Sequence, residues 1–208
     1  MPVDDPETVN DPAMWDQRYA EGLTGWDLGE APPVLRDLIR GELRPAGRIL
    51  VPGCGNGHDA LALAQAGWHV TGFDFAPRAI RAAREHARAT GVTVSFEVAD
   101  LFALPAAWAG AFDAVWEQTC YCAIHPERRD EYVAALAAVL KPGGRFVGLL
   151  MNHEKPDGPP FDVTRDDVRT RFAPLFDVEE LRTVTNSAAD RPGEFLVLAR
   201  RRVRSSGA

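Results

Sequence analysis

The sequence contains only three cysteines, Cys54, Cys120 and Cys122, among its 208 residues. Their spacing fits neither a zinc site nor a disulfide framework, so we expect no metal and reduced thiols in a cytoplasmic protein. A C-x-C metal or arsenic site at Cys120 and Cys122 is the alternative to small buried hydrophobic side chains. The chain also lacks a run of about eighteen apolar residues, which excludes a membrane-spanning helix. Its acidic start, M-P-V-D-D-P-E, lacks the apolar core of a signal peptide.

Basic residues are fewer than acidic ones, 23 against 30, and the formal net charge is −7. This balance disfavours nucleic acids and anionic membranes as partners, because both carry negative charge. The length and the hydrophobic fraction of 46% predict a single domain over residues 1–208. We expect a soluble enzyme with a small-molecule substrate, either a monomer or a weak homo-oligomer. Residues 1–44 would form an N-terminal lid with helices, and residues 45–208 the core.

One stretch combines a short apolar run, alternate glycines and a helical pattern: R-I-L-V-P-G-C-G-N-G-H-D-A-L-A-L-A, residues 48–64. It predicts a buried strand, a tight turn and the start of a helix over 57–66. Gly53, Gly55 and Gly57 permit positive φ and leave no Cβ where a ligand approaches. The free N–H groups and the positive dipole end of the helix point at the same place. The stretch therefore predicts a site for a small molecule with a polar or charged part.

The rest of the chain alternates strand and helix patterns. Further strands are expected at 68–74, 92–98, 111–117, 145–151, 176–185 and 194–202. Further helices are expected at 77–90, at 127–140 and after Thr164, which is placed to cap its helix. This alternation predicts an α/β fold with a doubly wound, mostly parallel seven-stranded sheet, to which the final hairpin adds an antiparallel member. In such sheets the ligand lies beyond the carboxyl ends of the strands.

The N-terminal region is rich in aromatic residues after a proline-rich, acidic stretch over 1–12 that we expect to be loose. Asp11 before Pro12 predicts the start of a helix that carries Trp15 and Tyr19 on one face. Glycines end this helix, and Trp26 follows in a loop. We interpret the three aromatic residues as a cover over a pocket. A hydrophobic patch that docks the terminus on the core is the alternative. A second helix is expected from Pro32-Pro33 to about Gly41.

Asp74 closes the second expected strand and follows Gly53 by 21 residues. An acid at this distance meets the ribose of a bound nucleotide. The alternative for Asp74 is an N-cap of the helix that begins at Pro77. The loop G-C-G-N-G has its third glycine one residue earlier than a dinucleotide-binding loop, which disfavours NAD.

Four motifs in order resemble the class I S-adenosylmethionine (SAM) methyltransferases, which have a Rossmann-like fold. They are P-G-C-G-x-G, the acid Asp74, Asp100-Leu101 after the third strand, and L-K-P-G-G before the fifth. The stretch W-x-x-R-Y-x-x-G-x-T-G-W-D-x-G-x-A-P resembles the N-terminal lid of the thiopurine S-methyltransferase superfamily. V-P-G-C-G-x-G-H-D, C-A-I-x-P-x-x-R and G-P-P-F-x-V are closer to its thiol and halide methyltransferase branch.

The resemblance implies SAM as cofactor and S-adenosylhomocysteine (SAH) as product, together with a set of cofactor-binding positions. These are Trp15, Tyr19, Trp26, Gly53, Cys54, Gly55, Asp74, Asp100, Leu101 and Gln118. Tyr19 stands where relatives often have tryptophan. Gln118 stands where the thiopurine enzymes have arginine and the plant enzymes tyrosine, so the identity of the substrate stays open more than that of the cofactor.

The implied reaction is methyl transfer to a small soft nucleophile: a thiol, hydrosulfide or a halide. Aromatic faces suit the sulfonium cation, which gives Tyr19 a catalytic interpretation. No N-P-P-Y or D-P-P-Y motif follows the fourth strand, and such acceptors need little general base. Tyr121 is interpreted as a catalytic residue that points at the acceptor, with a core aromatic as the alternative.

Three histidines are candidates for other roles. His58 is interpreted as part of the turn-to-helix packing, whereas His125 and His153 are expected nearer the acceptor, where either could deprotonate a thiol. For both, a solvated histidine in a loop is the alternative. Two other functions remain open. One is a methyltransferase for thiopurines or other aromatic thiols, and the other is a SAM-binding protein without catalysis.

Overall fold

A computed structural model describes residues 6–154, 157–188, 191 and 193–203. Within these ranges seven strands form one sheet in the order β3-β2-β1-β4-β5-β7-β6. Their bounds are β1 Arg48–Pro52, β2 His69–Asp74, β3 Ser95–Val98, β4 Phe112–Gln118, β5 Leu140–Met151, β6 Phe176–Thr183 and β7 Glu194–Arg201. The first five strands are parallel, and β7 runs antiparallel between β5 and β6. The prediction of a mostly parallel seven-stranded sheet with a final antiparallel hairpin is confirmed.

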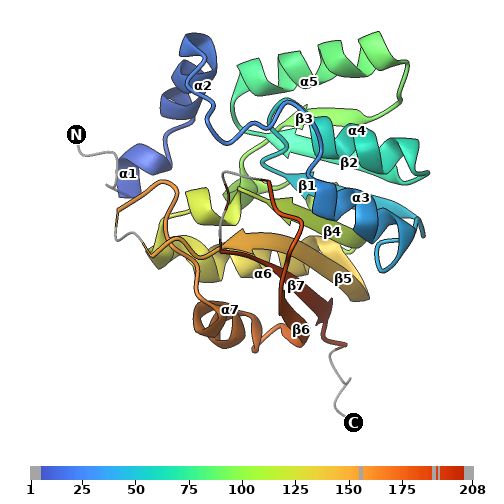
Figure 1. The fold of residues 1–208 in the computed structure, drawn as a ribbon, viewed down its shortest axis with the longest axis vertical. Coiled ribbons are helices and arrows are strands. Elements are labelled where there is room, and N and C mark those ends of the chain that lie inside the picture. Colours follow the sequence, from blue (N-terminus) through green and yellow to red (C-terminus); the bar gives the residue numbers. More distant parts are fainter. Residues whose placement is uncertain (1–5, 155–156, 189–190, 192, 204–208) are drawn as a thin grey trace.

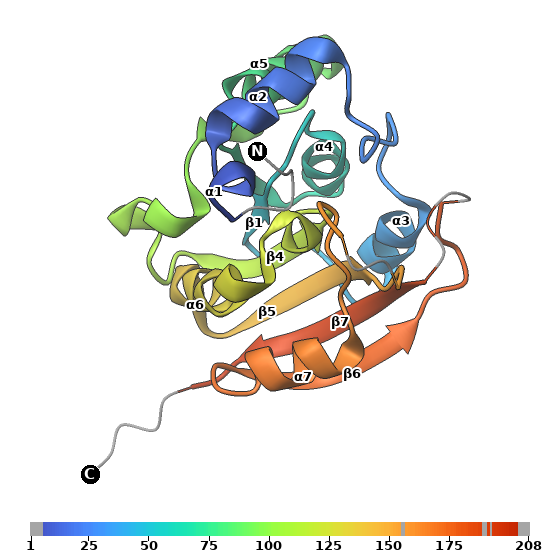
Figure 2. The same cartoon turned by 90° about the vertical axis from the view of Figure 1, so that its left-hand side faces the viewer.

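Helices cover both faces of the sheet (Figure 1). Helices α3 (Pro33–Arg40), α4 (His58–Gln65) and α5 (Pro77–Thr90) pack on one face, and α6 (Arg129–Val139) and α7 (Arg165–Phe172) on the other, as Figure 2 shows. Each face has its own hydrophobic cluster: Trp116 belongs to the first and Phe146 to the second. A strand such as β1, buried on both faces, needs apolar residues at consecutive positions, which explains its unbroken I-L-V.

The helix that carries the aromatic residues, α2 (Pro12–Glu21), begins as predicted. The Asp11 side chain accepts a hydrogen bond from the Ala13 amide at 2.9 Å, and Gly22 ends the helix with φ of 70°. The helix lies beside α5, where the Arg78 amide donates to Asp16 Oδ1 at 2.8 Å. The two ends of α2 are set by the local caps at Asp11 and Gly22, and the contact with α5 fixes its position.

The expectation of a loose N-terminal stretch is wrong for the residues preceding α2. Residues Pro6–Val9 form a short helix, α1, and Val9 is buried. The Trp15 indole N–H donates to the Val9 carbonyl at 2.8 Å, which ties α1 to α2. Residues 1–5 lie outside the described ranges.

Other boundaries differ from the predicted ones. Strand β3 begins at Ser95 rather than 92, and β5 begins at Leu140, so that it includes the K-P-G-G segment. Short 3-10 helices at Leu101–Ala103, Ala106–Trp108, Tyr121–Ala123 and Pro126–Arg128 were not predicted. Thr164 caps α7 as expected, with its hydroxyl accepting from the Asp167 amide at 3.0 Å. Among the described residues, no helix has the length and apolar character needed to cross a membrane.

Candidate functional site

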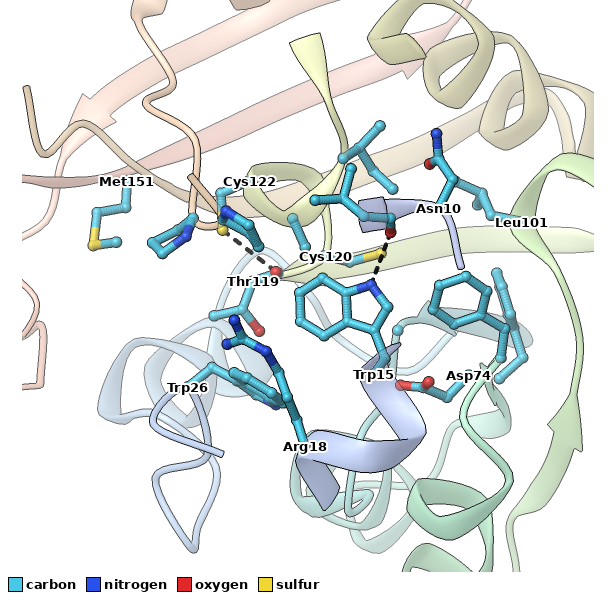
Figure 3. Close-up of a pocket in the computed structure, with 18 of the residues that line it drawn as sticks. Asn10, Trp15, Arg18, Trp26, Asp74, Leu101, Thr119, Cys120, Cys122 and Met151 are labelled. Carbon is cyan, nitrogen blue, oxygen red and sulfur yellow. Dashed lines mark hydrogen bonds between the residues drawn. The ribbon is translucent and has the colours of Figure 1, made fainter. Parts of the chain in front are cut away.

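A cavity of about 390 Å³ lies at the carboxyl ends of the parallel strands, beneath α2 and the loop that follows it. Figure 3 shows part of its lining. The walls come from α1 and α2, from the ends of β1, β2, β4 and β5, and from the segment after β3. This is where an open α/β sheet binds its ligand, because the helices and loops there leave a crevice.

The aromatic cover, which we define as Trp15, Tyr19 and Trp26, forms one side of this cavity. The Trp26 ring centroid lies 5.4 Å from that of Trp15 and 5.7 Å from that of Tyr19, both in edge-to-face geometry. The Trp26 indole N–H also donates to the Tyr19 hydroxyl at 3.3 Å. Burial, followed by the nearby Asp74 carboxyl, raises the pKa of Tyr19, so this hydroxyl stays neutral. The three residues lie where the cover interpretation expects them.

The glycine turn after β1 is closed in from two sides. Gly53 has φ of 54°, and a Cβ there would lie 2.8 Å from the Cys120 sulfur. Gly55 has φ of 51°, and a Cβ there would lie 3.0 Å from the Tyr19 hydroxyl oxygen. Any larger residue would be strained and would also push away the β4 segment or the aromatic cover. Cys54, between the two glycines, lines a smaller neighbouring cavity.

Asp74 lies on the wall of the large cavity, nearly buried. Its Oδ2 accepts from the Gly55 amide at 3.1 Å and its Oδ1 from the Ala76 amide at 2.9 Å. Burial raises the pKa of this carboxyl to about 6, although these hydrogen bonds oppose the shift. A carboxylate oxygen can accept two hydrogen bonds, so Asp74 keeps the capacity to accept from ribose hydroxyls. The N-cap of α5 is Ala76, which corrects the alternative that Asp74 caps this helix.

The remaining predicted cofactor positions are divided between two cavities. Asp100 and Leu101 line the large one, directly after β3, and Asp100 caps a 3-10 helix by accepting from the Phe102 amide at 2.9 Å. Gln118, at the end of β4, lines the smaller cavity of about 50 Å³ together with Cys54. Trp26 and Gly53 line both. The structure thus places the predicted positions around two adjoining cavities, except Gly55, which lines neither and donates its amide to Asp74.

Gln118 contacts the charged residues beside the smaller cavity. With its amide oriented to suit its neighbours, it donates to Asp59 at 2.8 Å and accepts from Arg191 at 3.1 Å. Burial raises the pKa of the Asp59 carboxyl to about 6. Asp59 also accepts from the Trp116 indole at 2.6 Å, which fixes it against the sheet.

Tyr121 does not line either cavity, which corrects the expectation that it points at the acceptor. It is fully buried, and its hydroxyl donates to Asp167 Oδ2 at 3.0 Å. Its ring contacts Tyr132 edge-on at 5.1 Å between centroids. The turn that precedes it is held by Glu117 Oε1, which accepts from the Tyr121 amide at 2.7 Å. The other interpretation, a core aromatic, describes its placement.

The candidate histidines also lie away from the large cavity. His125 caps a 3-10 helix, and its Nδ1 accepts from the Glu127 amide at 3.3 Å. His153 is not part of the lining. His58 is paired with Asp27, Nε2 to Oδ1 at 3.3 Å, in keeping with a packing role beside the glycine turn.

Several lining residues were missed by the sequence analysis. Those after β4 and at the end of β5 form an apolar, sulfur-bearing wall: Cys120, Cys122, Ile124 and Met151. Arg18 also lines the cavity, and its position between Trp15 and Tyr19 on α2 could have indicated this. Arg191 comes from the connection between β6 and β7, and no local pattern marks it.

Known proteins that resemble this chain in sequence are methyltransferases, in agreement with a cofactor site at this end of the sheet. Residues 10–196 match the sequence model of a family described as thiopurine S-methyltransferase (TPMT). The chain is 34% identical to thiocyanate methyltransferase 1 of Brassica oleracea over 171 residues, which cover 78% of this chain and 74% of that protein. It is 30% identical over 186 residues to a thiopurine S-methyltransferase of Legionella pneumophila, covering 82% of this chain and 84% of the other.

A solved structure supports the fold. The 1,6-didemethyltoxoflavin-N1-methyltransferase of Burkholderia thailandensis, crystallised with S-adenosylhomocysteine, superposes with a TM-score of 0.76 at 20% identity, covering 97% of this chain and 92% of that one. The Rossmann-like class I fold and SAM as cofactor, both expected from the motifs, are confirmed. The chain belongs to the thiopurine S-methyltransferase family of SAM-dependent methyltransferases.

Proposed function

We propose that this enzyme transfers the methyl group of SAM to a small soft nucleophile in the cytoplasm: a thiol, hydrosulfide or a halide. The observation that carries the proposal is the wall formed by Cys120, Cys122, Ile124 and Met151, which is apolar and polarisable. In the part of the chain that the structure describes, no histidine lines this cavity. An acceptor that arrives as an anion needs no base, so this wall suits it.

The residues present fit the cofactor. When bound, SAM supplies a methyl group on a sulfonium sulfur: an acceptor lone pair forms the new bond to carbon as the C–S bond breaks and its electrons stay on sulfur. Asp74 would accept the ribose hydroxyls, and Asp100 with Leu101 would contact the adenine. The Gly53–Gly55 turn and Gln118 would hold the amino-acid part of the cofactor.

The aromatic cover would face the sulfonium. The guanidinium Cζ of Arg18 lies 5.6 Å from the Trp15 ring centroid and 6.0 Å from that of Trp26, so these rings already accept a cation. The cover also keeps water from the acceptor, and holding the two reactants in line would supply most of the acceleration.

An aromatic thiol is the second candidate. Besides Ile124 and Met151, Pro159 and Pro160 add apolar surface to the same side of the cavity, which suits a flat ring. The thiopurine S-methyltransferase from Legionella matches about as much of this chain as the thiocyanate methyltransferase from Brassica does.

One assay separates these possibilities. The protein is incubated with SAM and, separately, with iodide, hydrosulfide, thiocyanate, a benzenethiol and a thiopurine, and the SAH formed is measured. Turnover of the small anions supports the proposal, and a preference for the thiopurine supports the second candidate. If calorimetry shows that SAM binds but no acceptor yields SAH, both catalytic readings fail and a SAM-binding protein without catalysis remains.

A further inference from the structure

Among the residues that the structure describes, three arginines line the large cavity, and two of them have anionic partners. Arg128 is paired with Glu131, with Nη2 and Oε2 2.7 Å apart. Arg191 is buried, lies 3.9 Å from Glu194 (Nη1 to Oε1) and also donates to a backbone carbonyl of the loop after α2. The positive charges of these two are therefore largely compensated within the protein.

Arg18 differs from both. Within the described ranges its guanidinium makes no hydrogen bond and no ion pair, and it lies over the rings of Trp15 and Trp26. Figure 3 shows its side chain directed from α2 into the cavity, on the side of Trp26 and Thr119. A half-buried cation without an anionic partner, aimed into a ligand cavity, is suited to an anion.

The negative charge of the chain makes a local cation important for binding an anion. The formal net charge of −7 repels anions from the surface, so a negatively charged acceptor needs a local positive group. Guanidinium is more weakly hydrated than an ammonium group and loses less when it contacts a large, polarisable anion. The neighbouring wall with Cys120, Cys122 and Met151 is polarisable in the same way.

We propose that Arg18 binds the negatively charged methyl acceptor and thereby selects anionic nucleophiles over neutral ones. The inference rests on the proposed function, since it concerns the acceptor half of the same cavity. Arg18 acts before methyl transfer: the acceptor carries its full charge when it enters and becomes neutral as the new bond to carbon forms.

This order of events predicts a particular kinetic signature. The attraction between Arg18 and the acceptor is strongest in the ground state and weaker in the transition state, where the acceptor has lost part of its charge. Removing the guanidinium should therefore raise KM for anionic acceptors and leave kcat unchanged or higher. A purely structural role for Arg18 in the aromatic cover would instead lower kcat and weaken cofactor binding.

The test compares three variants. Arg18→Met keeps an unbranched apolar stem over the tryptophans, and Arg18→Lys keeps the charge. Arg81→Met, on the exposed face of α5, makes the same change in net charge away from the cavity. SAH formation gives kcat and KM for thiocyanate and iodide. Calorimetry gives the affinities for SAM and SAH, and for thiocyanate added to the SAH complex.

We expect Arg18→Met to raise KM for both anions by roughly tenfold, with unchanged SAH affinity, and Arg18→Lys to recover most of the loss. Arg81→Met should behave as the wild type. An unchanged KM in Arg18→Met, or an SAH affinity that falls as far as KM rises, would overturn the inference. Tighter binding of SAM but not of SAH would also overturn it, because Arg18 would then compete with the sulfonium.

The calorimetry also separates this inference from the proposed function. If the wild type forms no SAH with any acceptor, the proposed function fails, and thiocyanate binding to the SAH complex still decides the role of Arg18. Binding that disappears in Arg18→Met and persists in Arg18→Lys supports the anion site. Equal binding in wild type and Arg18→Met, or none in the wild type, refutes it.

Discussion

Asp27 holds the loop after Trp26 against the glycine turn, and its replacement by asparagine should destabilise the fold in a pH-dependent way. Its Oδ1 lies 3.3 Å from His58 Nε2 and accepts from the Gly29 amide at 2.8 Å. Its Oδ2 accepts from the Asn56 side-chain amide. Both members of the ion pair are mostly buried, so solvent screens the interaction only in part.

The size of the effect follows from the pKa of Asp27, which these contacts, first of all the hydrogen bond from His58, lower from 3.8 to about 2. At about 1.36 kcal/mol per pKa unit, this corresponds to about 2 kcal/mol of stability. Because the pKa of Asp27 is lowered on folding, this stability is complete above about pH 4 and is lost as the pH falls through about 2.

His58 limits the effect at high pH. The hydrogen bond to Asp27 raises the pKa of His58 above 6.5, so its contribution is complete below that pH and is lost as the pH rises through the folded value. The ion pair therefore contributes its full stability between about pH 4 and about 6.5.

Urea unfolding at about pH 5.5 and about pH 8.5 measures the effect. Asp27→Asn should lose about 2 kcal/mol of unfolding free energy at the lower pH and clearly less at the higher one. Glu30→Gln is the matched control, because it makes the same chemical change in the same loop at an exposed pair with Arg36 and should cost less than about 1 kcal/mol. Equal losses for Asp27→Asn at both pH values, or none at the lower one, would refute the reasoning.

Three further predictions concern the site. Asp74→Ala should weaken SAH binding by about 1–3 kcal/mol in calorimetry, as expected when buried hydroxyls lose a partner, and unchanged affinity would leave Asp74 only a structural role. Trp26→Ala should lower the rate of SAH formation more than it lowers the free energy of unfolding; equal losses would favour the docking interpretation. Burial raises the pKa of Glu117 to about 7, so the wild type should lose stability as the pH rises from 4.5 towards that value. Glu117→Gln keeps an acceptor for the backbone amides and can donate to Tyr132, so it should reduce this slope in urea unfolding, while the raised pKa values of Asp59 and Asp74 keep part of it; an unchanged slope would contradict this.

Features that depend on neighbours within a few residues were predictable. The caps at Asp11 and Thr164 formed as expected, because each side chain meets an amide two or three residues further on. The glycine turn was recognisable because the positive φ values of Gly53 and Gly55 suit glycine alone among common residues. The order of strands and helices followed from their hydrophobic periodicity.

Features that depend on residues farther away along the chain were not predictable from the sequence. Val9 is buried and its carbonyl accepts a hydrogen bond from the Trp15 indole N–H, and nothing in the proline-rich start indicates this contact. Tyr121 was expected at the acceptor, yet its hydroxyl reaches Asp167 at the start of α7, 46 residues away. The K-P-G-G turn was expected to precede β5, but pairing with β4 begins already at Leu140.

For the site, the motifs were sufficient to indicate the cofactor, because the glycine turn and Asp74 lie at the ends of adjacent strands in any sheet of this topology. The acceptor side is different, since its wall brings together residues from the ends of β4 and β5 and an arginine from α2. Whether Arg18 meets an acidic partner or faces the cavity alone depends on how α2 packs across the sheet. Charge compensation between segments distant in sequence is a property of the folded chain, so only the tertiary structure distinguishes Arg18 from Arg128 and Arg191.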